Sequence, residues 1–253
     1  MDTTRHNLTD ETWNKIKDLL PSERTGKRGR PAKDNRMVLD AILWLLRTGA
    51  PWRDLPAEFG SWKSVYTRFR RWKIKGVWET VFTILAEEKE EEGILIDSSI
   101  IQAHQHAAGA KGGQSEQALG CGGFSTKIHM SVDALGNPLR FLLTGGQVSD
   151  FLMAEPLLQG QKLSTVLADK GYDSDKLVAF IEHGGEAIIP WKSSRKHPPP
   201  NRKCDWHQYK ERHLIECFFN KIKHFRRIAT RYDKLASSYL AMLHIVGSLI
   251  WLR

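Results

Sequence analysis

The first 75 residues carry apolar side chains at the three-to-four-residue spacing of amphipathic helices. This spacing predicts helices over residues 9–20, which a proline ends, and over residues 35–47, which are followed by a glycine. A third predicted helix, residues 61–73, places aromatic side chains on one side and basic side chains largely on the others. Short helices with one strongly basic member are typical of a helix-turn-helix-like module whose last helix enters a DNA groove.

The pattern changes from helical to extended after residue 92. Residues 93–101 form a predicted core strand interrupted by Asp97, and residues 124–132 and 138–144 flank a turn sequence, which indicates a β-hairpin. Later segments alternate between helical patterns and short apolar runs: residues 150–158, 165–168, 174–182, 186–190, 207–227 and 234–252. A hairpin beside strands joined by helices predicts an α/β fold, in which a mixed sheet is covered by helices.

Charge divides the chain in the same way. The formal net charge is +9, and residues 1–75 carry 17 Lys and Arg against 9 Asp and Glu. Residues 76–100 carry 1 against 7, and residues 101–253 carry 20 against 13. We therefore expect a helical DNA-binding domain over 1–75, an acidic helical connector over 76–92, and an α/β domain over 93–253 with a loop or insertion near 191–206. The two basic blocks favour a polyanionic partner such as double-stranded DNA.

The basic residues of the first block are the candidate DNA contacts. Residues 26–31 resemble a flexible hook that enters a minor groove, although a solvated linker explains this stretch equally well. The helix over 61–73 combines basic with aromatic side chains, which favours DNA contact over an ordinary charged helix face. The candidate DNA-binding residues are Arg28, Arg30, Lys63, Arg68, Arg70, Arg71 and Lys73.

The expected compartment is a reducing cytoplasm. Three cysteines without a CxxC pair disfavour a disulfide framework, and the polar N-terminal residues predict no secretory signal. Residues 235–252 are apolar and free of charge, which raises the question of a membrane span. Because this stretch contains three serines, a tyrosine and a histidine, we expect a buried core helix with no membrane contact.

Three acids are the candidate chemical groups. Asp97 and Asp169 each follow an apolar run at a predicted strand, where burial of a carboxylate is costly without a cation or hydrogen-bond donors. Glu216 lies in the predicted helix over 207–227. Each acid taken singly is explained by a capped turn or an ion pair. Together they supply the hard oxygen ligands that magnesium prefers, and two such ions can drive phosphoryl displacement.

The predicted helix over 207–227 places four polar residues on one face. Counting from Tyr209 at about 100° per residue, Arg212, Glu216 and Lys223 fall near 300°, 340° and 320°. The apolar residues of the helix fall on the other side. This spacing predicts an acid flanked by cations that can meet phosphate oxygens, whereas an exposed row of ion pairs is the alternative.

These motifs resemble bacterial insertion-sequence transposases of the DDE superfamily. The resemblance rests on the Tyr-x2-Arg-x3-Glu-x6-Lys spacing and covers nearly the whole chain. Its other motifs include Ile96-Asp97-Ser98-Ser99, Asp169-Lys170-Gly171-Tyr172-Asp173, Thr126-Lys127-Ile128-His129, residues 133–139, residues 225–233 and residues 49–56. The resemblance implies a ribonuclease H-like catalytic core, a helical domain that reads terminal inverted repeats, and metal-dependent DNA cleavage and strand transfer.

The resemblance also implies roles for individual residues. Asp97, Asp169 and Glu216 fall on the catalytic, metal-binding acids, which would hold magnesium, or manganese in its place, as a pair of ions. Supporting and phosphate-binding positions fall on Tyr172, Tyr209, Arg212 and Lys223. The pattern departs from the family at Gln102, where a basic residue is common, and at residues 121–123. A homo-oligomer is implied for the step in which two element ends are brought together.

Three other functions compete with this hypothesis. A serine or tyrosine recombinase would leave the three acids without a role. A magnesium nuclease would lack the separate basic helical module. A catalytically silent, transposase-derived repressor would still bind DNA, but the sequence retains all three acids and the polar helix face.

Overall fold

The computed structural model describes residues 7–23, 33–87, 92–109, 117–120, 124–196 and 204–253. The candidate hook residues Arg28 and Arg30, the departure at 121–123 and the acidic residues 88–91 lie outside these ranges. Gln102 lies within them, near the end of a strand.

Four helices make up the N-terminal part: α1 (Asp10–Ile16), α2 (Asn35–Thr48), α3 (Trp62–Ile74) and α4 (Val77–Ala86). The side chain of Thr9 accepts a hydrogen bond from the backbone N–H of Thr12, and Asp34 caps α2 in the same manner. Gly49 ends α2 in the left-handed conformation, with φ of 74°. The first three helices confirm the helical pattern of the sequence. The fourth lies in the predicted connector, where it buries Trp78, Val81 and Phe82.

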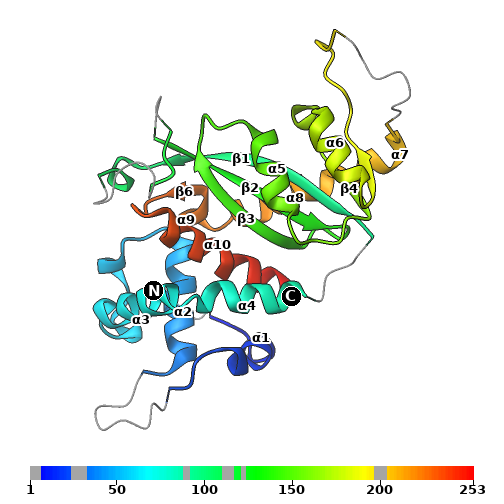
Figure 1. Ribbon diagram of the computed structural model, residues 1–253. Coiled ribbons are helices and arrows are strands. Elements are labelled where there is room, and N and C mark those ends of the chain that lie inside the picture. The colour runs from blue at the N-terminus through cyan, green and yellow to red at the C-terminus, as the bar shows by residue number, and fades with distance from the viewer. Residues whose placement is uncertain (1–6, 24–32, 88–91, 110–116, 121–123, 197–203) are drawn as a thin grey trace.

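A six-stranded mixed sheet forms the centre of the molecule (Figure 1). Its strands are β1 (Ile94–Ala103), β2 (Ser125–Asp133), β3 (Pro138–Gly145), β4 (Thr165–Leu167), β5 (Glu186–Ile188) and β6 (Thr230–Arg231). The order is β3-β2-β1-β4-β5, and β6 also pairs with β1. The first three strands run antiparallel, with the predicted hairpin between β2 and β3, whereas β4 and β6 run parallel to β1. This arrangement is the mixed α/β sheet expected for a ribonuclease H-like core.

Among the described residues after β1, six further α-helices are present: α5 (Ala154–Leu158), α6 (Asp175–Glu182), α7 (Trp206–Tyr209), α8 (His213–Lys223), α9 (Arg226–Ala229) and α10 (Ala236–Trp251). The prediction of one continuous helix over 207–227 was wrong. A 3-10 turn at Lys210–Arg212 interrupts it, and α8 ends before Phe225, which is extended with ψ of 102°. The break allows Phe225 and Ile228 to enter the core while the chain turns toward β6.

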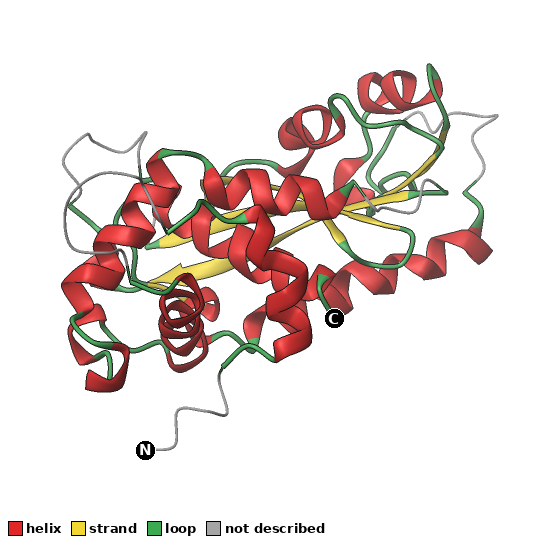
Figure 2. Ribbon diagram, turned by 90° about the horizontal axis from the view of Figure 1, so that it is seen from below, coloured by secondary structure: helices red, strands yellow, loops and turns green. Residues whose placement is uncertain are grey.

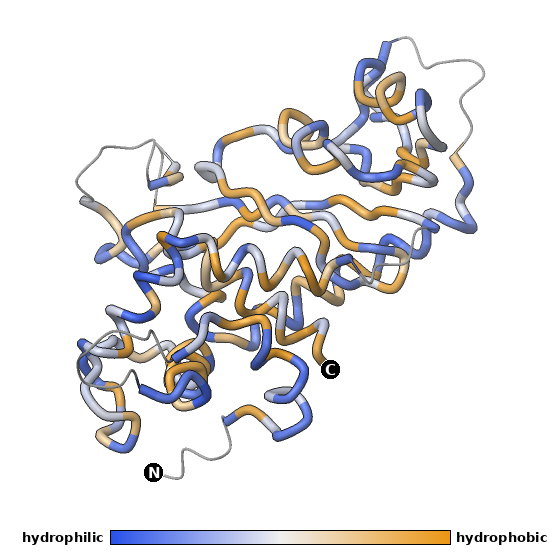
Figure 3. Tube along the Cα trace, turned by 60° about the horizontal axis from the view of Figure 1, so that its bottom comes forward, coloured by the Kyte–Doolittle hydropathy of each residue, from blue (hydrophilic) through white to orange (hydrophobic). Residues whose placement is uncertain are grey.

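Helices cover both faces of the sheet (Figure 2). On one face, Ile94 and Ile96 of β1 pack with α5 and α6 in a smaller core. On the other face, Leu95 and Ile101 belong to a larger core that continues through α8, α10 and the N-terminal helices. Hydrophobic stretches accordingly run through the packed strands and helices, while hydrophilic stretches lie toward the outside (Figure 3). The larger core therefore joins the helical module to the sheet.

Helix α10 is the segment whose apolar character raised the membrane question. Ten of its residues are buried, which confirms a core helix. Gly247 faces α4 so closely that an added Cβ atom would lie 2.6 Å from the ring of Phe82. Phe82 also stacks on His244 of α10, with ring centroids 5.2 Å apart. Within the described ranges, no helix is both long and apolar enough to cross a membrane.

Candidate active site

Asp97 lies in the middle of the sheet. Its strand, β1, has β2 on one side and β4 on the other. Its Oδ1 accepts a hydrogen bond of 2.8 Å from the backbone N–H of Ser98, and its Oδ2 accepts one of 2.9 Å from Nη1 of Arg212. The alternation of side chains along a strand places Asp97 on the face of the larger core and Ser98 on the opposite face.

Asp169 follows β4, the parallel neighbour of β1. Its Oδ1 accepts a hydrogen bond of 2.8 Å from the backbone N–H of Gly171 and so caps the 3-10 turn at Lys170–Tyr172. The charge of Asp169 acts on both Asp97 and Arg212. The two aspartates therefore belong to one electrostatic site, although 71 positions separate them along the chain.

Glu216 reaches the same site from the first turn of α8. The guanidinium of Arg212, one helical turn earlier, bonds Asp97 through Nη1 and Glu216 through Nη2. Because one planar guanidinium joins them, the two carboxylates lie within the roughly 8 Å that ligands of a two-ion site require. The ring of Tyr209 lies 6.0 Å from the same guanidinium. We name Asp97, Arg212 and Glu216 the acid–arginine cluster.

The acid–arginine cluster has an excess of negative charge. Burial raises the pKa of Asp97 above its ordinary value, and the negative charge of Asp169 adds to this increase. The Ser98 N–H and the Arg212 charge oppose the increase without cancelling it. A buried carboxylate with a raised pKa gains from an added cation.

The donor set fits a hard divalent ion. Carboxylate oxygens are the ligands that magnesium binds, and Arg212 already stands between two of the three acids as a cation. Within the described residues, no group of three acidic, histidine or cysteine side chains converges on one ion position, and the guanidinium of Arg212 lies between Asp97 and Glu216.

The other two predicted supporting residues differ in their environments. Lys223 is exposed near the end of α8, with its Nζ 5.9 Å from the ring of Phe219. Tyr172 is fully buried in the smaller core, where burial raises the pKa of its hydroxyl, as do the charges of Asp97, Asp150 and Asp169. Its place is thus behind the acids, without access to a DNA phosphate.

A second polar group, which sequence reasoning missed, lies behind Asp97. The Nζ of Lys127 donates to Oδ1 of Asp150 at 2.8 Å, and the Oγ of Ser98 donates to the same oxygen at 2.7 Å. His129, paired with Ser98 in the sheet register, is buried beside them, with Nδ1 3.8 Å from that oxygen. We name Ser98, Lys127 and Asp150 the lysine–aspartate cluster. Its sequence signal was Lys127 and His129 at alternate positions of a predicted strand, next to the apolar Ile128 and Met130.

The basic residues of α3 divide into two groups. Lys63, Arg70 and Arg71 are exposed. Arg68 donates to Oδ1 of Asn35 at 2.6 Å, and Lys73 donates to the hydroxyls of Ser237 and Ser238 at 3.1 Å, so these two also hold the fold together. A hollow of about 670 Å³ runs beside this helix and is lined by Lys33, Ser61, Lys63, Thr67, Arg68 and Arg71.

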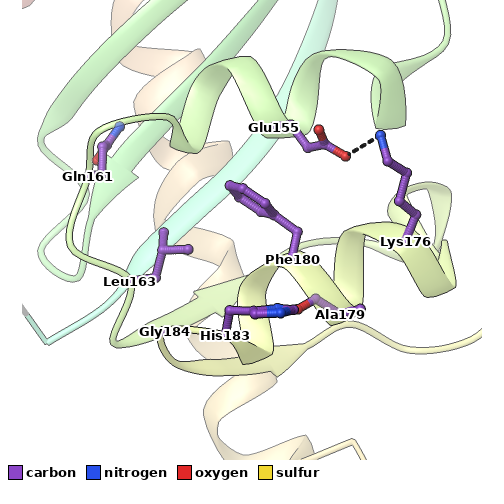
Figure 4. Close-up of a pocket in the computed structure, with 8 residues that line it drawn as sticks. All are labelled: Glu155, Gln161, Leu163, Lys176, Ala179, Phe180, His183 and Gly184. Carbon is purple, nitrogen blue, oxygen red and sulfur yellow. Dashed lines mark hydrogen bonds and ion pairs between the residues drawn. The ribbon is translucent and has the colours of Figure 1, made fainter.

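Another hollow of about 670 Å³ lies between α5 and α6 (Figure 4). Glu155 and Lys176 form an ion pair of 2.9 Å at its rim, and Phe180 lies within it. None of the three candidate acids lines it. This hollow is therefore separate from the candidate active site.

Comparison with known proteins identifies relatives for both parts of the chain. Residues 8–82 match a family described as putative transposase of the IS4/5 family. The putative transposase for insertion sequence element IS6501 of Brucella ovis is 44% identical over 134 residues, which are 51% of this chain and 99% of that protein. An uncharacterized 16.2 kDa protein of insertion element IS402 from Burkholderia cepacia is 36% identical over 119 residues, 43% of this chain and 80% of that protein.

Solved structures with a weaker likeness are those of Mos1 transposase. Its paired-end complex with the left transposon end has 12% sequence identity and a TM-score of 0.27, covering 85% of this chain and 86% of that one. Its strand transfer complex has 13% identity and a TM-score of 0.28, covering 84% and 85%. Residues 88–251 match the transposase DDE domain. Because this match spans well over half of the residues of this chain, the chain belongs to the DDE-domain transposase family.

Proposed function

We propose that this protein is a DNA transposase that cleaves the ends of an insertion sequence and joins them to target DNA with the help of magnesium. The observation that carries the proposal is the meeting of Asp97 and Glu216 on one guanidinium, with Asp169 close enough to act on both Asp97 and Arg212. The convergence of acids that lie far apart in the sequence supports their assignment as the ligand set of the family.

Asp97, Asp169 and Glu216 would hold the ions in this proposal. Two bound magnesium ions would activate the attacking water or 3′-hydroxyl and stabilise the leaving oxygen. Arg212, released from its two carboxylates, is placed to bind a phosphate oxygen through its planar fork. Tyr209, beside Arg212, limits the directions in which the guanidinium can swing. No covalent bond between protein and DNA is required.

Recognition of the element ends is assigned to the helical module. The exposed cations of α3, Lys63, Arg70 and Arg71, supply phosphate contacts, and the basic hollow beside them offers a concave approach. Joining two ends in one event requires two such modules, so we propose that the protein acts as a homo-oligomer at that step.

The test is cleavage of the element's own ends by the purified full chain with magnesium. The wild type is expected to cut at the element boundary, and Asp169→Asn and Glu216→Gln are expected to bind the same DNA without cutting it. Wild-type binding without cleavage at any magnesium or manganese concentration would instead identify a silent repressor. A trapped covalent adduct of protein and DNA would identify a serine or tyrosine recombinase.

A further inference from the structure

A basic hollow lies at the junction between the helical module and the sheet domain. Its volume is about 580 Å³. The C-terminal end of α2 forms one side, and the end of α8 with the start of α9 forms the other. Its principal lining residues are Arg47, Lys221, His224, Phe225, Arg226 and Arg253. No aspartate or glutamate of the described chain lines it, so the hollow concentrates positive charge.

The two sides of the hollow are held at a fixed separation. Gly49, which ends α2, approaches α9 so closely that an added Cβ atom would lie 3.1 Å from the Cβ of Arg226. Nη1 of Arg227 donates to the carbonyl oxygen of Ala50 at 3.0 Å across the same junction. Arg47 lies over the ring of the buried Phe225, 6.0 Å from its centroid. The hollow is therefore built by packing and does not depend on a loose surface loop.

The basic residues from Lys221 to Arg231 have two distinct environments. Arg227 and Arg231 are buried, and they bond Asp233 and backbone carbonyl oxygens. Lys221, His224 and Arg226 are exposed and form no ion pair with another residue of the described chain. Basic side chains that converge without a counter-charge raise the local potential, and an anion that enters the hollow relieves it.

The position of the hollow relative to the acids suggests which anion enters. Lys221 lies on α8 five residues after Glu216, about 7.5 Å further along the axis and about 140° around it. A duplex carries one phosphate charge for about every 1.7 Å of its axis. Lys221 therefore faces away from Glu216 around α8, and a duplex that extends from the acids past this end of the helix would bring further phosphates to the hollow.

We propose that this hollow binds the sugar-phosphate backbone of DNA, as a contact surface separate from both α3 and the three acids. This inference rests on the proposed function, because it takes duplex DNA as the substrate. Arg226 offers a planar fork and Lys221 a point charge, and together they bind phosphate oxygens without reading the base sequence. The junction then clamps DNA that the helical module has recognised.

The experiment compares the full-length wild type with the double variant Lys221→Ala/Arg226→Ala. Binding to duplex DNA is measured over a range of salt concentrations. The slope of log affinity against log salt should become shallower by about 2, or about one unit for each cation removed. At saturating DNA, the cleavage rate should stay within about twofold of the wild type, because neither residue belongs to the acid–arginine cluster.

The matched control is Lys15→Ala/Lys17→Ala, which removes one exposed charge from α1 and one from the 3-10 turn that follows it. Its salt slope should equal that of the wild type, and both double variants should keep the wild-type melting temperature. If Lys221→Ala/Arg226→Ala kept the wild-type slope of log affinity against log salt, the proposal would be overturned. Failure of the wild type to bind any DNA would overturn the proposed function itself, which is a different outcome.

Titration with inorganic phosphate alone shows whether the hollow binds a free small anion or the phosphate groups of DNA. The proposal expects free phosphate to bind too weakly to distinguish the double variant from the wild type. Binding of free phosphate that disappears in the double variant, together with an unchanged DNA salt slope, would mean that the hollow takes a small anion and would overturn the DNA assignment.

Discussion

The two faces of β1 carry two carboxylate–cation clusters that differ in how completely their charges are satisfied. In the lysine–aspartate cluster, the Lys127 side chain is 10% exposed and donates to both Asp150 and the carbonyl oxygen of Val148. In the acid–arginine cluster, the Glu216 side chain is 54% exposed, and one arginine serves two acids. We call the lysine–aspartate cluster, whose two charges form one ion pair, the closed cluster. We call the acid–arginine cluster, which has two acids for one arginine, the open cluster.

This difference shows how a single strand can both support a fold and prepare a reaction. Breaking a closed pair leaves a buried charge without a partner, which is costly. The open cluster has two acids for one arginine, and burial, with a smaller contribution from the charge of Asp169, raises the pKa of Asp97, so a cation brought to this carboxylate is stabilising. Substitutions on the two faces should therefore affect different properties of the protein.

The largest expected effect is that of Asp97→Asn on cleavage. The amide keeps the shape of the side chain but loses the anionic oxygen that binds an ion, so cleavage should fall to background. The free energy of unfolding should not fall, because the substitution removes a carboxylate whose burial is unfavourable. Cleavage assays and urea denaturation measure the two effects, with the exposed Asp18→Asn as control. A loss of stability equal to that of a core variant would contradict this separation.

The closed cluster should respond in the opposite way. Asp150→Asn leaves the ammonium of Lys127 buried without its counter-ion, and the free energy of unfolding should fall by about 3–4 kcal/mol. The double variant Lys127→Met/Asp150→Asn removes both charges and should recover most of that loss. Urea denaturation provides the measurement. If the single and double variants were equally unstable, the ion pair would not be the cause.

Each face also buries a histidine that should make stability depend on pH. Burial lowers the pKa of His129, beside the closed cluster, to about 4, and lowers that of His244, in the larger core, to about 4. The unfolded chain takes up these protons near the ordinary pKa of 6.5, so stability is complete above pH 6.5 and is lost as the pH falls toward 4. His244 alone should contribute on the order of 3 kcal/mol, because its pKa falls from 6.5 to about 4 and each pKa unit corresponds to about 1.4 kcal/mol.

His244→Phe tests this contribution. The ring stacks on Phe82 in the wild type, so phenylalanine can occupy the same place. The variant should show a shallower fall in unfolding free energy between pH 6.5 and 4, measured by urea denaturation at several pH values, while the contribution of His129 persists. An unchanged pH profile would show that His244 titrates equally in the folded and unfolded chain.

The smallest effect should come from an ion pair that belongs to neither cluster. Lys176 and Glu155 lie at the rim of the hollow between α5 and α6, with side chains 82% and 39% exposed (Figure 4). Lys176→Ala should change the free energy of unfolding by less than about 1 kcal/mol, because solvent screens exposed pairs. Cleavage should be unchanged. A large loss of activity would indicate that this hollow contributes to the reaction.

The elements that the sequence predicted well are those with a strong period. The amphipathic spacing of α2 and α3 and the turn between β2 and β3 report local chemistry, and the structure confirms them. The two-residue strand β6 was not predicted, because it exists only through pairing with the end of β1. The break between α8 and α9 was missed because it depends on where Phe225 packs.

The candidate site shows the same limit. Acids beside apolar runs are unusual, which is why the sequence singled out Asp97, Asp169 and Glu216 as candidates. Their catalytic role stays a prediction. The helical-wheel argument assumed one regular helix, so it could not foresee that Tyr209 and Arg212 precede α8, in a separate helix and a 3-10 turn, whereas Glu216 and Lys223 do share α8. Neither Tyr172 behind the acids nor Asp150 beside Lys127 could be placed from the sequence, because each position depends on contacts between distant segments.

The close approach of α10 to α4 at Gly247 restricts how segments of this protein can be exchanged during evolution. A segment that recognises DNA and a segment that cuts it could in principle be exchanged between mobile elements as separate cassettes. Here the C-terminal helix fits against the ring of Phe82 with no room for a methyl group. A foreign N-terminal segment that included α4 would have to reproduce that surface or leave an apolar helix uncovered. We therefore expect the two segments to be inherited together and to diverge in step.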